Sequence, residues 1–180
     1  TETFKNDPTE FYIGATDAKT GEVRFHKCTD GGPADIEWMR ASASMPVVSN
    51  IVSVDGYEML DGGIVCSVPY EYMEQQGYNR NVIVLTRQKG YRKKKSRIIP
   101  LVKIVLRKYP AIAKAMMVRH IVYNGQMDDI DRKESCGEVF VIRPPEDPGI
   151  GRTEKDPDEL ERVYQMGRDE AVRRLAELKS

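Results

Sequence analysis

The residues best placed to do chemistry are those of the triplet Asp61-Gly62-Gly63. Apolar, strand-like runs stand on both sides of it, so the aspartate is expected at the end of a strand. The two glycines permit a sharp turn with φ > 0 and leave space beside the carboxylate. An aspartate in that position can act as a general base or orient another group. The alternative is an aspartate that only hydrogen bonds within its own turn.

The same triplet occurs a second time, as Asp30-Gly31-Gly32. The three residues alone therefore do not predict a catalytic role. What separates the two copies is the sequence around them, and that context favours Asp61.

Other catalytic groups are scarce. His26 and His120 have no nucleophile close in sequence, and both are interpreted as structural. Ser42, Ser44 and Ser67 do not stand between glycines at a strand-to-helix elbow, so they are predicted to serve packing. The chain has no P-loop, no Gly-x-Gly-x-x-Gly, no HExxH and no Gly-x-Ser-x-Gly.

The cysteines Cys28, Cys66 and Cys136 are odd in number and lack CxxC spacing. This pattern argues against a zinc site or a disulfide framework, and it favours a reducing compartment. All three are predicted to be buried thiols. No metal and no cofactor are predicted.

The elements that must position these residues alternate between strands and helices, which favours an α/β fold with a mixed sheet. Two hairpins are expected, closed by a loop ending on Gly21 and by the turn Asp55-Gly56. The continuous apolar run NVIVLT is predicted to be a strand buried on both faces. The predicted strands are 11–16, 22–27, 47–54, 57–60, 81–86 and 138–143.

Proline and capping signals place the helices. Pro33 suits the first turn of a helix that Pro46 ends, and Pro110 is expected to break a helical pattern. Asp156 is the expected N-cap of the last helix. The predicted helical segments are 33–45, 69–76, 101–118 and 157–178.

The composition is that of one folded domain, or of one domain with a tail. Of the 180 residues, 40% are hydrophobic and 31% charged, which excludes collagen, a disulfide scaffold and general disorder. No apolar run approaches the ~18 residues that span a bilayer, and no signal peptide is present. A cytoplasmic protein, peripheral to the membrane at most, is expected. Because the chain opens on Thr1 and runs almost at once into an apolar stretch, it is interpreted as a piece of something longer.

The neutral total charge hides a basic band, residues 87–119. This band holds 12 basic and no acidic side chains, whereas residues 1–86 hold 6 basic and 13 acidic ones. Composition therefore changes near Arg87, which is the predicted boundary between a segment 1–86 and a segment 87–180.

The order of residues around Asp61 resembles the second half of the patatin-like phospholipase domain. Ala41-Ser42 and Pro46 precede a short apolar stretch, then come Asp61-Gly62-Gly63 and Pro69. The strand and hairpin at 11–22 also look like the family's segment before this motif. The resemblance covers roughly residues 11–86. Residues 87–180, with Ile150-Gly151-Arg152 and the closing helix, are similar to the C-terminal extension of a bacterial subgroup.

The resemblance implies a partial three-layer α/β/α domain with a mixed sheet, followed by a mainly helical extension. It also implies a serine carboxylic-ester hydrolase that acts on lipid esters through a Ser/Asp dyad, in which Asp61 accepts the proton of the serine. Gly62 and Gly63 would shape the turn that presents the aspartate. In this family the oxyanion loop and the Gly-x-Ser-x-Gly elbow precede the matched region, and the chain contains neither. The isolated chain is therefore predicted to be inactive, with the nucleophile on a missing N-terminal portion or on a separate chain.

The basic band offers an alternative function, a non-catalytic module that binds an anionic membrane or nucleic acid. Cations beside an apolar face suit an anionic membrane surface. Alternatively, the band is a helix that packs its apolar side on the core and exposes its cations to solvent. Nucleic acid is disfavoured because no recognised motif is present and the overall charge is zero. The cations proposed to meet the membrane are Arg92, Lys93, Lys94, Lys95 and Arg97.

Overall fold

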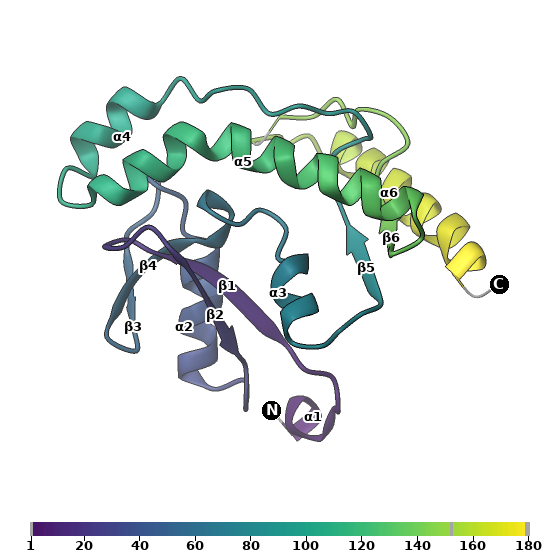
Figure 1. The fold of residues 1–180 in the computed structure, drawn as a ribbon, viewed down its shortest axis with the longest axis horizontal. Helices are drawn as coiled ribbons and strands as arrows, with labels where there is room; N and C mark the ends of the chain where they lie inside the picture. The colour runs from purple at the N-terminus through teal and green to yellow at the C-terminus, as the bar shows by residue number, and fades with distance from the viewer. Residues whose placement is uncertain (1, 152, 179–180) are drawn as a thin grey trace. The chain divides into compact units, whose positions relative to one another are not determined.

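The computed structural model describes residues 2–151 and 153–178 (Figure 1). Two residues used in the sequence interpretation, Thr1 and Arg152, lie outside this range. The described chain forms two compact units. Unit 1 comprises the residues up to 69 together with 93–126, and unit 2 comprises 70–92 together with the residues from 127 onward.

Unit 1 is built on a four-stranded antiparallel sheet with the order β2-β1-β4-β3. Both predicted hairpins are confirmed, since β1 pairs with β2 and β3 pairs with β4. The second hairpin is shorter than expected, because residues 47–51 form no strand and Val47 has a φ of 76°. The strands are β1 (Tyr12–Asp17), β2 (Val23–Lys27), β3 (Val52–Val54) and β4 (Tyr57–Asp61).

Helices cover both faces of this sheet. Successive side chains of β4 point to opposite faces, so neighbouring residues pack against different helices. Met59 packs in a core with Trp38 of α2 (Pro33–Ser42). Leu60, the next residue, packs in a second core with Val102 of α4 (Ile99–Val105) and Ile112 of α5 (Pro110–Ser135). The predicted break at Pro110 is confirmed. Helix α4 ends at Val105, and Pro110 begins the long helix α5. Two short helices, α1 (Glu2–Asn6) and the 3-10 turn η1 (Gly62–Ile64), complete this part of the chain.

Unit 2 contains a parallel pair of strands, β5 (Asn81–Val84) and β6 (Val139–Ile142). Burial of residues 81–86 on both faces was predicted, and this prediction is wrong. Val82 is 48% exposed and Val84 is 70% exposed, whereas Ile83 is buried. The continuous apolar run therefore has only one covered face. The helices of this unit are α3 (Tyr70–Gln75), the second part of α5 and α6 (Pro157–Leu178).

The α/β class is confirmed, but the predicted mixed sheet is not found among the described residues. Antiparallel and parallel pairs lie in separate sheets. The prediction of three buried thiols is also wrong, since Cys28 is buried, Cys66 is partly buried and Cys136 is exposed. Within the described ranges, no helix combines the length and the apolar character that crossing a membrane requires.

Candidate functional site

Asp61 is the last residue of β4, as the sequence predicts. Its position is fixed by the backbone on both sides. The Asp61 amide donates to the carbonyl of Ser44 over 2.8 Å, and its carbonyl accepts from the hydroxyl of the buried Thr16 over 2.8 Å. The aspartate therefore lies on a rigid strand end rather than on a free loop.

The Asp61 carboxylate is partly buried, and only half of it is engaged. Oδ1 accepts the amide of Gly63 over 2.7 Å, which caps the short turn η1. Among the described residues, Oδ2 has no hydrogen-bond partner. One oxygen therefore orients the group while the other remains available to accept a proton or a hydroxyl hydrogen.

The second triplet shows how much of this geometry is local. Asp30 Oδ1 accepts the amide of Gly32 over 2.8 Å, the same bond two residues ahead. Asp30, however, lies on an exposed loop rather than on a strand end. The hydrogen-bonded turn is thus a property of the triplet, and the placement on β4 is what distinguishes Asp61.

Of the two reasons predicted for Gly62 and Gly63, the positive φ is wrong, whereas the space beside the carboxylate is confirmed at Gly63. Neither residue adopts a positive φ. Gly62 is required because a Cβ there would collide with the carbonyl group of Gly14, at 2.7 Å from its carbon. At Gly63 a Cβ would lie 3.1 Å from Asp61 Oδ1. Close approach of β1 to the turn therefore explains the glycine at position 62.

We expect Gly62→Ala to destabilise the chain by more than about 3 kcal/mol, because a backbone carbonyl cannot yield as a side chain can. Gly125→Ala is the matched control. Gly125 lies inside α5 with nothing within 4 Å of the added methyl group, so it should gain about 0.5–1 kcal/mol of helix stability. Urea unfolding followed by circular dichroism measures both. Equal effects of the two changes would contradict the role given to Gly62.

Arg119 of α5 is a site residue that the sequence reasoning missed. Its Nε donates to the carbonyl of Gly63 over 2.6 Å. The hydroxyl of Ser67 donates to the same carbonyl over 3.2 Å. A guanidinium thus lies beside the aspartate turn, where it holds the turn and adds positive charge. The only sequence signal was its membership of the basic band, 56 positions after Gly63.

The hydroxyl groups of the three serines all donate hydrogen bonds to backbone carbonyls. Ser42 donates to Gly14 and Ser44 donates to Arg40, each over 2.8 Å. Ser67 donates to Gly63 as described above. A hydroxyl held in this way is a structural donor, in keeping with the packing role predicted for all three.

Beside the aspartate turn, the first residues of β1 lie outside the pairing with β4, and the carbonyl of Gly14 accepts the hydroxyl of Ser42 instead. Pairing with β4 begins at Ala15, opposite Asp61, and it does not extend to Ile13 or Gly14. A shallow pocket of about 310 Å³ lies beside these residues. Its lining includes Ile13, Gly14 and Ser42.

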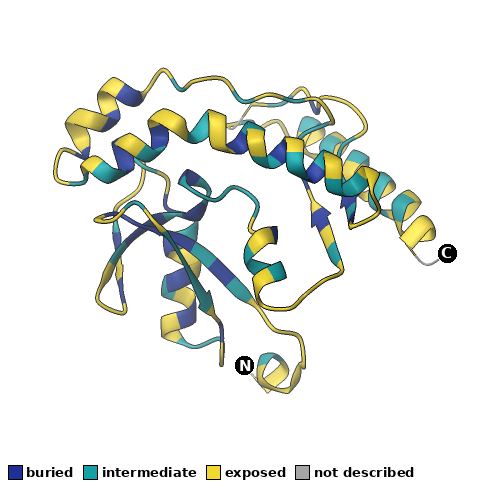
Figure 2. Cartoon of the chain, viewed as in Figure 1, coloured by how far each residue is buried: buried dark blue, intermediate teal, exposed yellow. Residues whose placement is uncertain are grey.

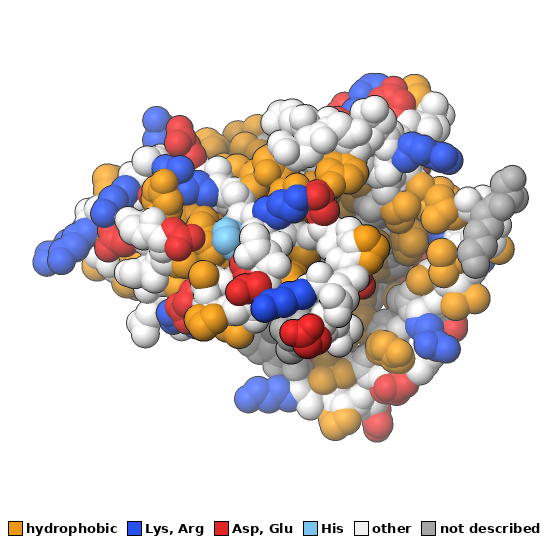
Figure 3. All heavy atoms as spheres, turned by 90° about the horizontal axis from the view of Figure 1, so that it is seen from below, with side chains coloured by type: hydrophobic (Ala, Val, Ile, Leu, Met, Phe, Trp, Pro, Cys, Tyr) orange, Lys and Arg blue, Asp and Glu red, His pale blue; other side chains and the backbone are white. Residues whose placement is uncertain are grey.

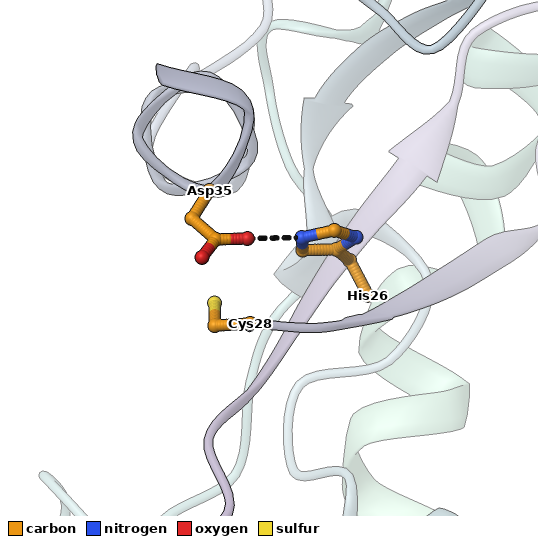
Figure 4. Close-up of side chains that lie close together, drawn as sticks. All are labelled: His26, Cys28 and Asp35. Atoms are coloured by element: carbon orange, nitrogen blue, oxygen red, sulfur yellow. Dashed lines mark hydrogen bonds and ion pairs between the residues drawn. The ribbon is translucent and has the colours of Figure 1, made fainter. Parts of the chain in front are cut away.

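A second polar cluster joins β2 to α2 (Figure 4). His26 Nε2 lies 2.6 Å from Oδ1 of Asp35, and the His26 ring stacks on Trp38. Oδ2 of Asp35 accepts three backbone amides, at distances from 2.9 to 3.1 Å. The donors are Thr29, Asp30 and Gly31. Asp35 thereby fixes both the strand and the loop that leads into α2.

His26, Cys28 and Asp35 have the ligand types of a metal site, and their ligand atoms lie within 4.8 Å of one another. Burial and the nearby Asp35 raise the pKa of the Cys28 thiol to about 11, which favours its protonated form. A metal would have to displace that proton and break the bond between His26 and Asp35. The hydrogen bonds therefore give this cluster a structural role, including the one predicted for His26.

His120 is partly buried on α5, and its Nδ1 has no hydrogen-bond partner among the described residues. Within the described ranges, no serine hydroxyl or cysteine thiol hydrogen bonds with the ring of His120. The structure thus adds no catalytic partner for this histidine.

Some cations of the basic band form ion pairs or contact aromatic rings, and others do not. Arg92 pairs with Asp128, and the Lys93 ammonium lies 3.8 Å from the centre of the Tyr123 ring. Farther along, α4 and the start of α5 carry cations with no acidic neighbour in sequence. On the face drawn in Figure 3, by contrast, basic and acidic side chains are interspersed.

Comparison with known families adds one finding. Residues 109–180 match a domain of unknown function, DUF6363. The DUF6363 match covers α5 from its start, β6 and α6. No family model of patatin-like proteins matched the chain, and no curated protein matched it. The domain boundary near Arg87 remains a prediction.

Proposed function

We propose that this chain is part of a patatin-like lipid acyl hydrolase and that Asp61 is the aspartate of its Ser/Asp dyad. The observation that carries the proposal is the state of the Asp61 carboxylate. One oxygen is held by Gly63, the other has no partner among the described residues, and the group stands at the end of β4, beside the part of β1 that β4 does not pair with. The resemblance of residues 11–86 supplies the reaction class.

In the proposed mechanism, a serine from a segment outside this sequence reaches Oδ2 of Asp61. The carboxylate accepts the hydroxyl proton as the serine oxygen attacks the ester carbonyl. The protonated Asp61 then gives this proton to the oxygen of the departing alcohol. Once ionised again, Asp61 takes a proton from the water that attacks the acyl-enzyme and returns it to the serine oxygen as the acid is released. Oδ1 keeps its bond to Gly63 throughout, so the turn η1 sets the direction in which Oδ2 points.

In this proposal, the nucleophile-bearing segment supplies the parallel strands that would complete the mixed sheet of a three-layer domain. They would dock at the part of β1 that β4 does not pair with. Residues 109–180, matched by DUF6363, would form most of the C-terminal extension. Lipid esters are the proposed substrates, at the cytoplasmic surface of a membrane.

The purified 180-residue chain should neither hydrolyse p-nitrophenyl esters above background nor react with a fluorophosphonate probe. The reason is that Ser42, Ser44 and Ser67 are bound to backbone carbonyls and lack an oxyanion loop. Mass spectrometry of the probe-treated chain measures this. Labelling of any of the three serines would contradict the proposed division of the dyad.

The coding sequence upstream of residue 1 tests the proposal directly. A Gly-x-Ser-x-Gly motif behind a glycine-rich turn would support a hydrolase whose rear portion is this chain. If upstream sequence exists without such a motif, and no separate chain supplies one, the enzymatic assignment fails. The alternative function, a module that binds anionic surfaces, would then rest on the basic band alone.

A further inference from the structure

Helix α4 is apolar on two sides, and only one of them is covered. Ile99, Val102 and Leu106 are buried in unit 1. Ile104 is 72% exposed, and Figure 2 shows exposed residues along most of this helix. The exposed apolar side chains at and within α4 are Ile98, Leu101, Ile104 and Val105. A surface helix of a globular protein normally carries polar residues on its outer side.

Cations flank α4 in the sequence, and Lys103 lies within it. No acidic residue occurs between positions 87 and 119. Within the described part of the chain, seven of the exposed cations in this stretch form no ion pair or side-chain hydrogen bond. They are Lys94, Lys95, Arg97, Lys103, Arg107, Lys108 and Lys114. Such a cluster attracts anions and repels itself until something negative approaches.

A groove between α4 and α5 brings the two features together. It has a volume of about 330 Å³, an apolar floor and three cations in its lining. The floor includes Leu106, Ala113 and Met117, and the cations are Lys103, Arg107 and Lys114. An anionic headgroup could meet the cations here while its chain contacts the floor.

We infer that the exposed apolar side chains of α4, the seven cations and the groove together bind the face of a bilayer that contains anionic phospholipid. This set of residues is called the α4 surface. The partner must be both apolar and anionic, and such a bilayer is both. Nucleic acid is anionic but would leave Ile104 and Leu101 in water. A second copy of the chain that docked through its own α4 would bring the same cations and repel. The inference stands on α4 and α5 alone and does not rest on the proposed hydrolase function.

Binding is expected to follow from two separable terms. Each Lys or Arg near an anionic surface strengthens binding about fivefold. The exposed apolar side chains add a contribution that salt does not screen. Affinity should therefore need both the anionic lipid and the apolar side of α4.

The test is co-sedimentation of the whole chain with phosphatidylcholine vesicles that do or do not contain about 30% phosphatidylglycerol, at roughly 0.1 M salt. We expect binding to the anionic vesicles and at least about tenfold weaker binding to the neutral ones. Circular dichroism verifies that each variant below remains folded.

Two variants and two matched controls identify the surface. Ile104→Glu should weaken binding about tenfold or more, whereas Val172→Glu, at a position 61% exposed on α6, should not. Neutralising the three groove cations to Gln should weaken binding on the order of a hundredfold. The control with the same change of net charge replaces Lys5, Arg80 and Arg168, which are exposed cations elsewhere.

Loss of anionic-vesicle binding in both α4-surface variants, with both controls retained, supports the inference. Absence of vesicle binding, equal binding to neutral vesicles, or equal loss in the controls overturns it. An oligonucleotide that binds with full strength to Ile104→Glu but not to the triple variant would assign the surface to nucleic acid instead. A dimer that Ile104→Glu dissociates would assign it to self-association.

Discussion

Under the proposed function, replacing Asp61 with Asn in the intact protein should lower kcat/KM for a lipid ester on the order of 1000-fold or more, because the serine would lose its proton acceptor. The Asn side chain keeps a carbonyl oxygen that can accept the Gly63 amide, as Asp61 Oδ1 does over 2.7 Å. The turn η1 should therefore survive, and the loss should be chemical rather than structural. Ester hydrolysis and unfolding midpoints of the same preparations measure the two effects separately.

Asp30→Asn is the control that the sequence itself offers. Asp30 begins the same triplet and makes the same bond to the amide two residues ahead, but it lies on an exposed loop. Its replacement should leave kcat/KM within about twofold, since it orients no reacting group. If both variants lose activity equally, the triplet supports folding in both places and Asp61 has no special role. If neither loses activity, the assignment of Asp61 to a dyad is wrong.

Elements with local signals could be predicted from the sequence. The turn between β3 and β4 was found because Asp55 and Gly56 both adopt positive φ, which those residue types tolerate. The start of α6 was found because Asp156 caps it, with Oδ1 accepting the amide of Asp158. In each case the structure follows from residues a few positions apart.

Features that depend on distant contacts could not be predicted. Gly62 was noticed for its flexibility, but it is required because Gly14 approaches it across the sheet. The strand at 81–84 was expected to be covered twice, because an apolar run does not reveal which of its faces will be covered. Arg119 reaches Gly63 only because α5 packs over that side of the sheet. Tertiary packing decided each of these.

The structural cluster around Asp35 lies between these two cases. Asp35 stands in the first turn of α2, and the N-cap of this helix, Gly32, has no side chain to cap it. An acid in that position is a local signal for an anchor that binds nearby amides. The sequence analysis gives Asp35 no role, because Asp35 is not followed by glycines as Asp30 and Asp61 are. Its hydrogen-bonded partner, His26, is only nine positions away.

We expect Asp35→Ala to destabilise unit 1 by about 3–5 kcal/mol. Asp35 is 1% exposed, and its removal would leave His26 and three backbone amides without their acceptor. Asp30→Ala, on the neighbouring exposed loop, should cost less than about 1 kcal/mol. Urea unfolding followed by circular dichroism measures both. A loss below about 1 kcal/mol at Asp35 would refute the anchoring role.

The same cluster predicts a dependence of stability on pH. Burial by itself would raise the pKa of Asp35, but the bond with His26 and the amides of Gly31, Thr29 and Asp30 outweigh it, lowering the pKa to about 2 from 3.8. Because the pKa of Asp35 is lower in the folded chain than in the unfolded chain, the ionised carboxylate stabilises the fold at any pH above the unfolded value. The free energy of unfolding should therefore fall by about 2 kcal/mol as the pH drops from about 4 to about 2. In Asp35→Ala this part of the pH dependence should disappear. If the variant and the unmodified chain lose stability in parallel over that range, the acid sensitivity arises from other carboxylates.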